Sequence, residues 1–406
     1  MDQNSRFLLK AFRKYYKDDP VIVPSRFSRR EFGFMFFDRN FVQRHMGFSK
    51  PAEINRFMVT QVPSHSYYST AYYRKPDAPT MEEKIWLGAD LIFDLDADHL
   101  VGAENMTYSE MLEQIKKEMI NLVDSFLLGD LGFSDEQVSI VFSGGRGYHA
   151  HIELNSVLGL GTHERREIVD YVTSNGLNID WVFPYTRYVT STANVNGMEK
   201  ANVSRIRTIP PADSGGWKLR MRNSLKDVVN DVCDMDPKEI KKEYPSVKSV
   251  ATKTIENHQI DLRKSRNLIF ENNKMSTLSK GTQEFLVKIM AEDMAFRLSG
   301  EVDEPVTADI KRLIRLPGSV HGKSGLRVMP LTRDELTDFD PLVSAVPSQY
   351  SDEEVTITMR KDTEITIKDQ HFKLSGTTKV PEYAAVFLVG RKMADIGDGT
   401  AKESLF

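Results

Sequence analysis

The chain has 406 residues, of which 40% are apolar and 28% are charged, and its formal net charge at pH 7 is −4. This composition excludes a collagen-like, low-complexity or disordered chain. It predicts a soluble globular protein of two or three structural units, or one large domain with an insertion. Cys233 is the only cysteine, which excludes an internal disulfide and a zinc site built from several thiolates.

The N-terminal segment does not have the pattern of a signal peptide. Residues 1–19 are interrupted by charge every few positions and lack a small-residue cleavage site. The longest apolar run, residues 383–389, is too short to span a bilayer. We therefore expect a cytoplasmic protein without membrane contact. The negative net charge argues against a surface coated with nucleic acid, but local basic stretches leave room for a basic channel: Arg26, Arg29 and Arg30; Arg205 and Arg207; Lys218, Arg220 and Arg222; Arg263, Lys264 and Arg266; Lys311, Arg312 and Arg315.

The N-terminal half of the chain predicts helices and strands in alternation. Residues 5–17 place apolar side chains at helical spacing among Lys and Arg, which indicates an amphipathic helix. The aromatic-rich EFGFMFF, residues 31–37, indicates a buried strand, and residues 66–73 and 89–96 indicate two more. Residues 107–128 carry apolar side chains at steps of three and four, so they predict the clearest helix of the sequence.

The rest of the chain predicts a mixed core that is interrupted once. Two strands, QVSIVF and YHAHIEL, are joined by the glycine-rich SGGRG, and a further helix begins beyond Thr162. Residues 221–280 are polar and poor in strand patterns, which indicates a small helical insertion. A helix over residues 283–298 follows, and EEVTITM and EITIK alternate as antiparallel strands. We expect a first part of the core over 1–220, the insertion over 221–282, and a second part of the core over 283–406.

The first candidate site is ADLIFDLDAD, residues 89–98. Along a strand, Asp94 and Asp96 project from one face while Phe93 and Leu95 project from the other. Two carboxylates about 7 Å apart along a strand can converge on one hard cation such as Mg²⁺ or Mn²⁺. A strand that runs into a solvated acidic loop would give the same pattern. However, Asp94 interrupts an apolar run, where a buried carboxylate requires a compensating partner.

The second candidate site is FSGGRGYHAHIEL, residues 142–154. Its three glycines permit backbone angles that turn amides toward an anion, and Arg146 adds a planar donor suited to phosphate. His149 and His151 share one face of the following strand. The segment lacks the spacing of a phosphate-binding P-loop. A glycine-rich hairpin turn without further function is the alternative for this segment.

The third candidate site is EVDEPVTADIKRLIRLPGSVHGKSG, residues 301–325. Asp303 offers a third carboxylate. Arg312 and Arg315 are expected on one face of a short helix, near the turn that carries His321. An acidic residue before a helix is also an ordinary partner of the helix dipole, which is the simpler explanation for Asp303 taken alone.

Together the three segments supply carboxylates for a metal and glycine, arginine and histidine groups for a triphosphate. This inventory fits in-line phosphoryl transfer, in which metal ions clamp the attacking and leaving oxygens and fixed cations stabilise the developing charge. The residues alone do not distinguish a polymerase from a nuclease or a sugar-nucleotide transferase.

In this order, the three segments resemble the motifs of the archaeal and eukaryotic primase small subunits. FDLD resembles the family's metal-binding pattern, SGGRGYH its SGxRGxH nucleotide-binding pattern, and the run from Asp303 through RLPGSVH its late segment. The resemblance extends to RKPDAPTMEEKIWLGADLIFDLDAD and to REF near the start, and covers most of the chain. It implies an α/β fold of the mixed α+β kind, in which a primase-type catalytic core with mixed sheets is flanked by helices and carries the helical insertion.

The resemblance also implies roles for individual residues. Asp94, Asp96 and Asp303 are implied as catalytic residues and as ligands of Mg²⁺ or Mn²⁺, with two ions expected. Glu31 and Arg44 fall where the family has further active-site residues, once one inserted residue is allowed. The residues implied to bind the incoming nucleoside triphosphate are Ser143, Gly144, Arg146, His149, Arg315 and His321.

One feature of the family is missing. Relatives often carry a zinc knuckle of Cys and His shortly after the metal-binding aspartates, whereas residues 97–141 contain no cysteine and only His99. The helix over residues 107–128 takes its place in the sequence. We therefore expect no structural zinc.

The function implied is that of the catalytic subunit of a DNA primase. Such a metal-dependent nucleotidyltransferase, a DNA-directed RNA polymerase of the primosome, makes short primers on a single-stranded DNA template, with extension by deoxynucleotides as a further option. The implied partner is a large primase subunit in a heterodimer, which would provide nucleic-acid surface that this acidic chain lacks. The alternatives are a related primase-polymerase of repair, a DxD glycosyltransferase, and a noncatalytic nucleic-acid-binding or scaffold subunit.

Overall fold

The computed structural model describes residues 1–100, 102–195, 198–296 and 299–397. The chain forms two compact units. Unit 1 comprises Met1–Leu128, Gly132–Val169 and Glu301–Phe406, and unit 2 comprises Gly129–Leu131 and Asp170–Gly300. In the described part of the chain, no helix is long and apolar enough to cross a membrane.

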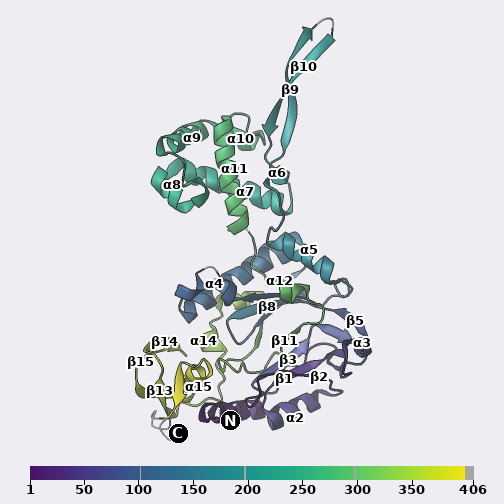
Figure 1. Ribbon diagram of the computed structural model, residues 1–406, viewed down its shortest axis with the longest axis vertical. Helices are drawn as coiled ribbons and strands as arrows, with labels where there is room; N and C mark the ends of the chain where they lie inside the picture. Colours follow the sequence, from purple (N-terminus) through teal and green to yellow (C-terminus); the bar gives the residue numbers. More distant parts are fainter. Residues whose placement is uncertain (101, 196–197, 297–298, 398–406) are drawn as a thin grey trace. The chain divides into compact units, whose positions relative to one another are not determined.

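The acidic motif lies at the edge of an antiparallel sheet in unit 1, with the strand order β12–β7–β8–β6. Figure 1 labels β8 of this sheet. Every residue of β8 is buried, and β6 is buried except at its two aspartates. The apolar run of β6 therefore faces the core, while the aspartates mark the positions where that burial is incomplete. The strands are β6 (Leu91–Asp96), β7 (Ser139–Phe142), β8 (Gly147–Ile152) and β12 (Met329–Leu331).

A second antiparallel sheet of unit 1 has the order β11–β3–β1–β2. Its strand β11 pairs with β3 and places Arg315 opposite Tyr67. The prediction of a short helix that carries Arg312 and Arg315 is therefore wrong. The edge of β3 that does not pair with β1 offers backbone hydrogen-bonding groups, and the segment of Arg315 pairs there as β11. The spacing of residues in the sequence does not reveal such an edge. The strands are β1 (Phe32–Met35), β2 (Gln43–Met46), β3 (His65–Ser69) and β11 (Leu313–Arg315).

Two strands that the sequence predicted as continuous are each divided. The segment 66–73 gives β3 and then β4 (Ala71–Tyr73), and the segment 89–96 begins with the end of β5 (Trp86–Ala89) before β6. β4 and β5 pair with each other in a separate small sheet, with the short helix α3 (Met81–Lys84) between them in the chain. Local alternation predicts extended backbone, but it does not show where a strand changes its sheet.

The helices of unit 1 pack against these sheets. α1 (Gln3–Asp18) is amphipathic as predicted and buries Phe12 and Tyr15. α4 (Tyr108–Asn121) begins at a capping box of Thr107 and Glu110, contacts β8, and continues as a π-helix over Leu122–Asp130. The remaining helices of the unit are α2 (Pro51–Gln61), α12 (Glu304–Ala308), α13 (Arg333–Asp338) and α14 (Pro341–Ser344), and α5 (Thr162–Val172) runs across the boundary of the two units in the chain.

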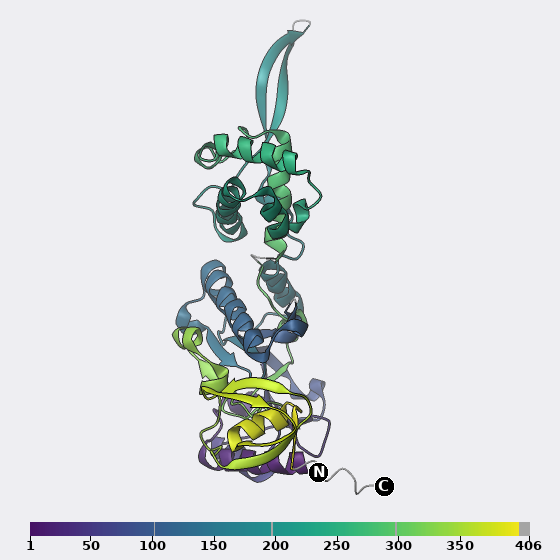
Figure 2. The same ribbon diagram turned by 90° about the vertical axis from the view of Figure 1, so that its left-hand side faces the viewer.

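The C-terminal strands of unit 1 surround α15 (Glu382–Gly390), as Figure 2 shows. The long apolar run of the sequence belongs to this helix, and all its residues from Tyr383 to Gly390 are buried. EEVTITM and EITIK form antiparallel strands as predicted. The strands are β13 (Glu354–Met359), β14 (Thr363–Ile367), β15 (Gln370–Leu374), β16 (Thr377–Pro381) and β17 (Ala394–Ile396).

Unit 2 combines a helical core with a two-stranded hairpin. In the core, α7 packs against α9 and α11, and Cys233 is buried. The hairpin pairs β9 (Tyr185–Val195) with β10 (Met198–Arg207) and extends away from these helices (Figure 1). The helices are α6 (Ile179–Val182), α7 (Gly216–Asp234), α8 (Pro237–Glu243), α9 (Thr252–Ser265), α10 (Leu268–Glu271) and α11 (Lys280–Phe296).

Unit 2 is larger than the helical insertion predicted over 221–282. The hairpin and the start of α7 lie before this range, and most of α11 lies after it. The predicted bounds followed a change in composition. The actual bounds follow from packing, because α7 and α11 bury their apolar faces against each other.

Candidate active site

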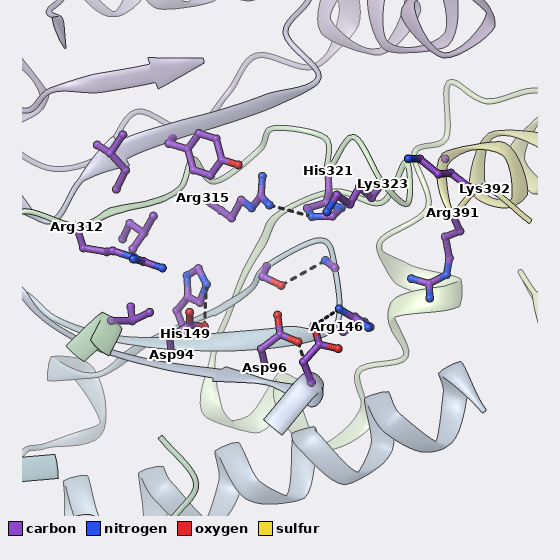
Figure 3. Close-up of a pocket in the computed structure, with 18 residues that line it drawn as sticks. Asp94, Asp96, Arg146, His149, Arg312, Arg315, His321, Lys323, Arg391 and Lys392 are labelled. Atoms are coloured by element: carbon purple, nitrogen blue, oxygen red, sulfur yellow. Dashed lines mark hydrogen bonds and ion pairs between the residues drawn. The ribbon is translucent and has the colours of Figure 1, made fainter. Parts of the chain in front are cut away.

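A cavity of about 590 Å³ in unit 1 brings the three sequence motifs together (Figure 3). Asp94 and Asp96 from β6 lie on one side of it, and Arg315, His321 and Lys323 lie across from them. Its charged side chains comprise three carboxylates and six cations, so the lining carries an excess of positive charge: Asp94, Asp96, Asp98, Arg146, Arg312, Arg315, Lys323, Arg391 and Lys392.

The acidic side of the cavity is built by the pairing of β6 with β8. Asp94 lies directly opposite His149 in the ladder, and its Oδ1 is 3.3 Å from Nε2 of that histidine. Burial, together with the neighbouring charges of Asp96 and Asp303, raises the pKa of Asp94 above its ordinary value, although His149 opposes this. Burial lowers the pKa of His149. The ionised carboxylate is therefore short of compensating positive charge.

The glycine-rich turn between β7 and β8 closes the site next to Asp96. Gly147 lies so near β6 that a Cβ at its position would be 2.1 Å from the carbonyl oxygen of Leu95, so only glycine fits there. Gly144 has a φ of +74° and lies against His321. Within the turn, the amide of Gly145 donates to Oγ of Ser143 over 3.3 Å.

Arg146 extends from this turn into the cavity and forms an ion pair with Asp98. Both side chains are partly exposed, so this pairing is open to exchange for another anion. The turn itself is supported by Tyr108 of α4, whose hydroxyl donates to the carbonyl oxygen of Gly145 over 2.5 Å. The turn predicted to bind nucleotide therefore lines the cavity.

Arg315 is held across the cavity by two histidines. It donates to Nδ1 of His65 over 2.6 Å and to Nε2 of His321 over 3.0 Å, and its guanidinium lies 4.6 Å from the ring centre of Tyr67. Since arginine can only donate, both imidazoles must accept and are therefore neutral. Burial, with the charges of Arg315 and Lys323, lowers the pKa of His65 to about 2 and that of His321 well below its usual value.

The guanidinium of Arg315 carries five N–H hydrogens that can be donated, and the two histidines accept only two of them. The remaining donors can serve an anion in the cavity. Burial lowers the pKa of Arg315, which shows that its charge is partly stripped of water. A phosphate group would compensate this desolvated positive charge and accept hydrogen bonds from the planar guanidinium.

Asp303 lies beside the cavity but does not line it. Its amide donates to the carbonyl oxygen of Asp94 over 2.9 Å, and its carboxylate caps α12 by accepting from the amide of Val306 over 3.3 Å. Its charge is still close enough to raise the pKa of Asp94. Both readings of Asp303 thus have support, since it caps a helix and also adds to the acidic cluster.

Glu31 and Arg44 do not line this cavity. Glu31 is fully buried and forms ion pairs with Arg44 over 3.0 Å and with Lys84 over 2.8 Å. Burial opposes ionisation, but the hydrogen bonds from Arg44 and Lys84 prevail and lower the pKa of Glu31. Arg44 lines a smaller cavity of about 260 Å³, which shares Tyr67, Arg312 and Leu313 with the main cavity.

The donor set of the acidic side fits a hard divalent cation. Carboxylate oxygens are the ligands such ions prefer, and magnesium is typically bound by one or two carboxylates together with substrate phosphates. In the described part of the chain, no three acidic, histidine or cysteine side chains form a ready-made metal cage. Asp94 and Asp96 are therefore suited to an ion that arrives with a phosphate ligand.

The comparisons with known proteins agree with this geometry. Residues 93–333 match the family of the DNA primase small subunit. The DNA primase small subunit PriS of Methanocella arvoryzae is 42% identical over 409 residues, covering 97% of this chain and 99% of the relative. The proteins of the same name from Methanococcoides burtonii and Methanothrix thermoacetophila are 40% and 38% identical, and each alignment covers at least 97% of both chains.

The chain belongs to the archaeal DNA primase small subunit family. As a primase small subunit it is a catalytic nucleotidyltransferase that synthesises primers in replication. Membership of the family implies catalysis with a divalent metal. The fold has the mixed α/β character predicted from the sequence. These findings leave no support for the glycosyltransferase and noncatalytic alternatives.

Sequence reasoning missed several residues of the primase cavity. Lys323 follows the predicted His321 by two positions, so its motif was in view. Arg391 and Lys392 come from the end of α15 and had no signal in the sequence beyond their charge. His65 had none either, because its contact with Arg315 depends on the pairing of β3 with β11.

Proposed function

We propose that this primase small subunit joins nucleotides on a single-stranded DNA template through the cavity of unit 1. A primer or initiating nucleotide 3′-hydroxyl attacks the α-phosphorus of a nucleoside triphosphate. A new phosphorus–oxygen bond forms, the bond to the β-phosphate bridge breaks, pyrophosphate leaves, and the hydroxyl proton passes to solvent. The observation that supports this proposal is the division of one cavity into the carboxylates of β6 and a facing wall of cations.

In this proposal, Asp94, Asp96 and Asp303 hold two divalent ions, Mg²⁺ or Mn²⁺. The raised pKa of Asp94, caused first by burial and then by the neighbouring aspartates, marks a cluster in need of positive charge. When bound, such ions lower the pKa of the attacking hydroxyl and neutralise the leaving pyrophosphate. Asp303 takes part if its carboxylate leaves the end of α12, where it accepts from the amide of Val306 over 3.3 Å.

The triphosphate would occupy the cationic side. We assign its binding to the residues predicted from the sequence, and add Lys323 from the cavity wall: Ser143, Gly144, Arg146, His149, Arg315, His321 and Lys323. Arg315 has donors to spare, and the carboxylate partner of Arg146 is exposed and exchangeable. The histidines are neutral at pH 7, since burial lowers their pKa values, so they serve as hydrogen-bonding groups rather than as proton shuttles.

We further propose a large primase subunit as the partner in a cytoplasmic heterodimer. The support is that the relatives are named as small subunits, which implies a large subunit. The net charge of −4 is consistent with a partner that provides part of the nucleic-acid surface. Both ribonucleotides and deoxyribonucleotides are candidate substrates, with deoxynucleotides used for extension.

The test uses the purified chain, a single-stranded template and labelled nucleoside triphosphates, with and without a short primer. Product should require Mg²⁺ or Mn²⁺ and should vanish with EDTA. The variant Asp94→Ala/Asp96→Ala should be inactive. The matched control is Asp362→Ala, because Asp362 is an exposed aspartate of the same unit outside the cavity.

Product without a primer would favour primer synthesis over the action of a repair polymerase. Parallel reactions with ribo- and deoxyribonucleotides would give the substrate preference. If the wild type is silent, the assay is repeated with the large subunit. Silence there as well, or full activity of Asp94→Ala/Asp96→Ala, would overturn the assignment.

A further inference from the structure

The hairpin of unit 2 exposes side chains that its fold does not require. β9 and β10 pair over their length, and together they form a sheet of only two strands. Such a hairpin has little stability of its own in water. Four of the eleven large apolar side chains that are exposed among the described residues lie within 23 positions here: Trp181, Tyr185, Val189 and Val203. This concentration indicates a contact surface.

Two arginines lie directly opposite each other on this hairpin. Arg187 pairs with Arg205 in the register, and both side chains are exposed. Like charges at directly opposed positions destabilise a two-stranded pair, because their Cβ atoms lie about 5 Å apart. Among the described residues, neither guanidinium has an acidic partner.

The neighbouring Arg207 shows what a structural arginine looks like at the same hairpin. It is buried, donates to the carbonyl oxygen of Phe183 over 2.8 Å, and pairs with Asp180 over 2.7 Å. Its guanidinium also lies 4.3 Å from the ring centre of Tyr185. Its charge is thus used within the protein, whereas the charges of Arg187 and Arg205 are left for an external anion.

Exposed aromatic and aliphatic side chains accompany this positive charge. Tyr185 is 47% exposed and Trp181, on α6 at the start of the hairpin, is 55% exposed. Along the ladder, the pair Val189 and Val203 lies two positions beyond the arginine pair and therefore on the same face. Arginines next to flat or apolar side chains match a single nucleic-acid strand, whose phosphates carry charge and whose bases stack.

We propose that the hairpin surface, formed by Trp181, Tyr185, Arg187, Val189, Val203 and Arg205, binds single-stranded DNA outside the catalytic cavity. The arginine pair contacts phosphates, and the aromatic side chains stack on bases. The inference rests on the proposed function, because it takes the template as the strand bound. Charge complementarity favours DNA over a protein: the segment 185–207 has four basic residues and one acidic residue.

The test measures binding of a labelled 30-nucleotide single strand to the full-length chain by fluorescence anisotropy at about 0.1 M salt. Arg187→Ala/Arg205→Ala should weaken binding by roughly tenfold or more, as expected for two lost phosphate contacts. The charge-retaining Arg187→Lys/Arg205→Lys should keep most of the affinity. The matched control is Arg6→Ala/Arg13→Ala on α1, which removes two exposed arginines of unit 1.

Trp181 provides a second readout. The chain has three tryptophans, and Trp217 is buried, so Trp181 supplies an exposed indole whose emission a stacked base should quench. DNA should quench the wild type, and Trp181→Phe should lose that part of the quenching. A purely structural role of the hairpin would leave both the quenching and the affinity unaffected by these variants.

The outcomes separate this inference from the proposed function. Asp94→Ala/Asp96→Ala should bind DNA as the wild type does, and a wild type that binds DNA through the hairpin but joins no nucleotides would refute only the proposed function. Equal affinity of wild type and Arg187→Ala/Arg205→Ala would overturn the inference. Equal affinity together with lost binding to the large subunit would overturn it in favour of a protein-docking surface.

Discussion

The cavity of unit 1 and the hairpin of unit 2 both present arginines, but they hold them differently. Arg315 is fixed by His65 and His321 and is largely removed from water. Arg187 and Arg205 are exposed and are held by no acidic side chain among the described residues. A fixed, dehydrated cation recognises one phosphate geometry, whereas exposed cations attract any phosphate chain.

The difference also determines how much each region lowers the stability of the folded protein. The cavity holds neutral histidines around Arg315, and burial raises the pKa of the Asp94 carboxyl that lies across from it. Such a site is destabilising until its ligands bind, which is common for preorganised active sites. The arginines of the hairpin are exposed to water, so the destabilisation they cause is limited to the repulsion between their charges. Four predictions test this contrast.

The largest effect is expected from Asp94→Asn. Primer synthesis should fall by about a thousandfold or more, since loss of a metal-binding carboxylate removes several kcal/mol of transition-state stabilisation. The melting temperature should stay level or rise. Burial raises the pKa of Asp94 in the folded state, so at pH 7 its charge opposes folding, and the neutral amide removes that cost.

Activity and melting temperature of Asp94→Asn are compared with those of Asp362→Asn, an exposed aspartate. A clear drop in melting temperature with the loss of activity would mean that Asp94 is structural. It would also remove the contrast between a cavity whose buried charges oppose folding and a hairpin whose charges are solvated.

A smaller loss is expected from Arg315→Ala. The KM for the nucleoside triphosphate should rise by about a hundredfold, because a charge-assisted donor to phosphate contributes about 2–3 kcal/mol. Arg315→Lys should recover only part of this, since an ammonium cannot reproduce the planar guanidinium. Arg312→Ala, at an exposed position of the same cavity, should raise the KM only a few-fold. Equal effects of Arg312→Ala and Arg315→Ala would show that fixing the arginine contributes nothing.

The sequence predicted the chemistry of the cavity better than its construction. The aspartates of β6 and the glycine-rich turn are local patterns that the sequence displays, and the pairing of β6 with β8 brings them to one cavity. On the facing wall, Arg315 and His321 were candidates from the sequence, but the way the wall is built was not predicted. It depends on the pairing of β11 with β3, and the sequence indicated a helix at Arg315 instead.

The same distinction holds for the rest of the fold. Helices such as α1 and α4 were predicted because each carries its own stripe of apolar side chains at helical spacing. The extent of unit 2 was not, because α7 and α11 belong together only through their mutual packing. Glu31 and Arg44 were brought in by resemblance, and outside the cavity the buried carboxylate of Glu31 pairs with the exposed guanidinium of Arg44.

The third prediction concerns acid. The folded-state pKa of His65 is about 2 and that of His321 is well below its usual value, so the unfolded chain binds protons that the folded chain excludes. Their contribution to stability is present above pH 6.5 and is lost as the pH falls below it. At pH 5.5 the two histidines should lower the free energy of unfolding by about 3 kcal/mol relative to pH 7.5.

Urea unfolding at these two pH values checks the effect. The variant His65→Gln/His321→Gln should lose about 3 kcal/mol less on acidification than the wild type, whereas His163→Gln, at an exposed position, should follow the wild type. Equal losses in all three proteins would show that the histidines around Arg315 are not held neutral, and Arg315 would then lack its two acceptors.

The smallest expected effect is on the salt dependence of DNA binding, which should distinguish the exposed arginines of the hairpin from Arg315 of the cavity. For a single strand, the logarithm of the affinity falls with the logarithm of salt concentration by about 0.7 for each phosphate neutralised. Arg187→Ala/Arg205→Ala should therefore reduce this slope by about 1.4, while Arg315→Ala should leave it unchanged for a strand that lacks a triphosphate. Anisotropy titrations between about 0.05 and 0.3 M salt measure the slope. If Arg315→Ala reduces the slope and the hairpin variant does not, the template's phosphates are bound in the cavity, and the roles assigned to the two regions must be exchanged.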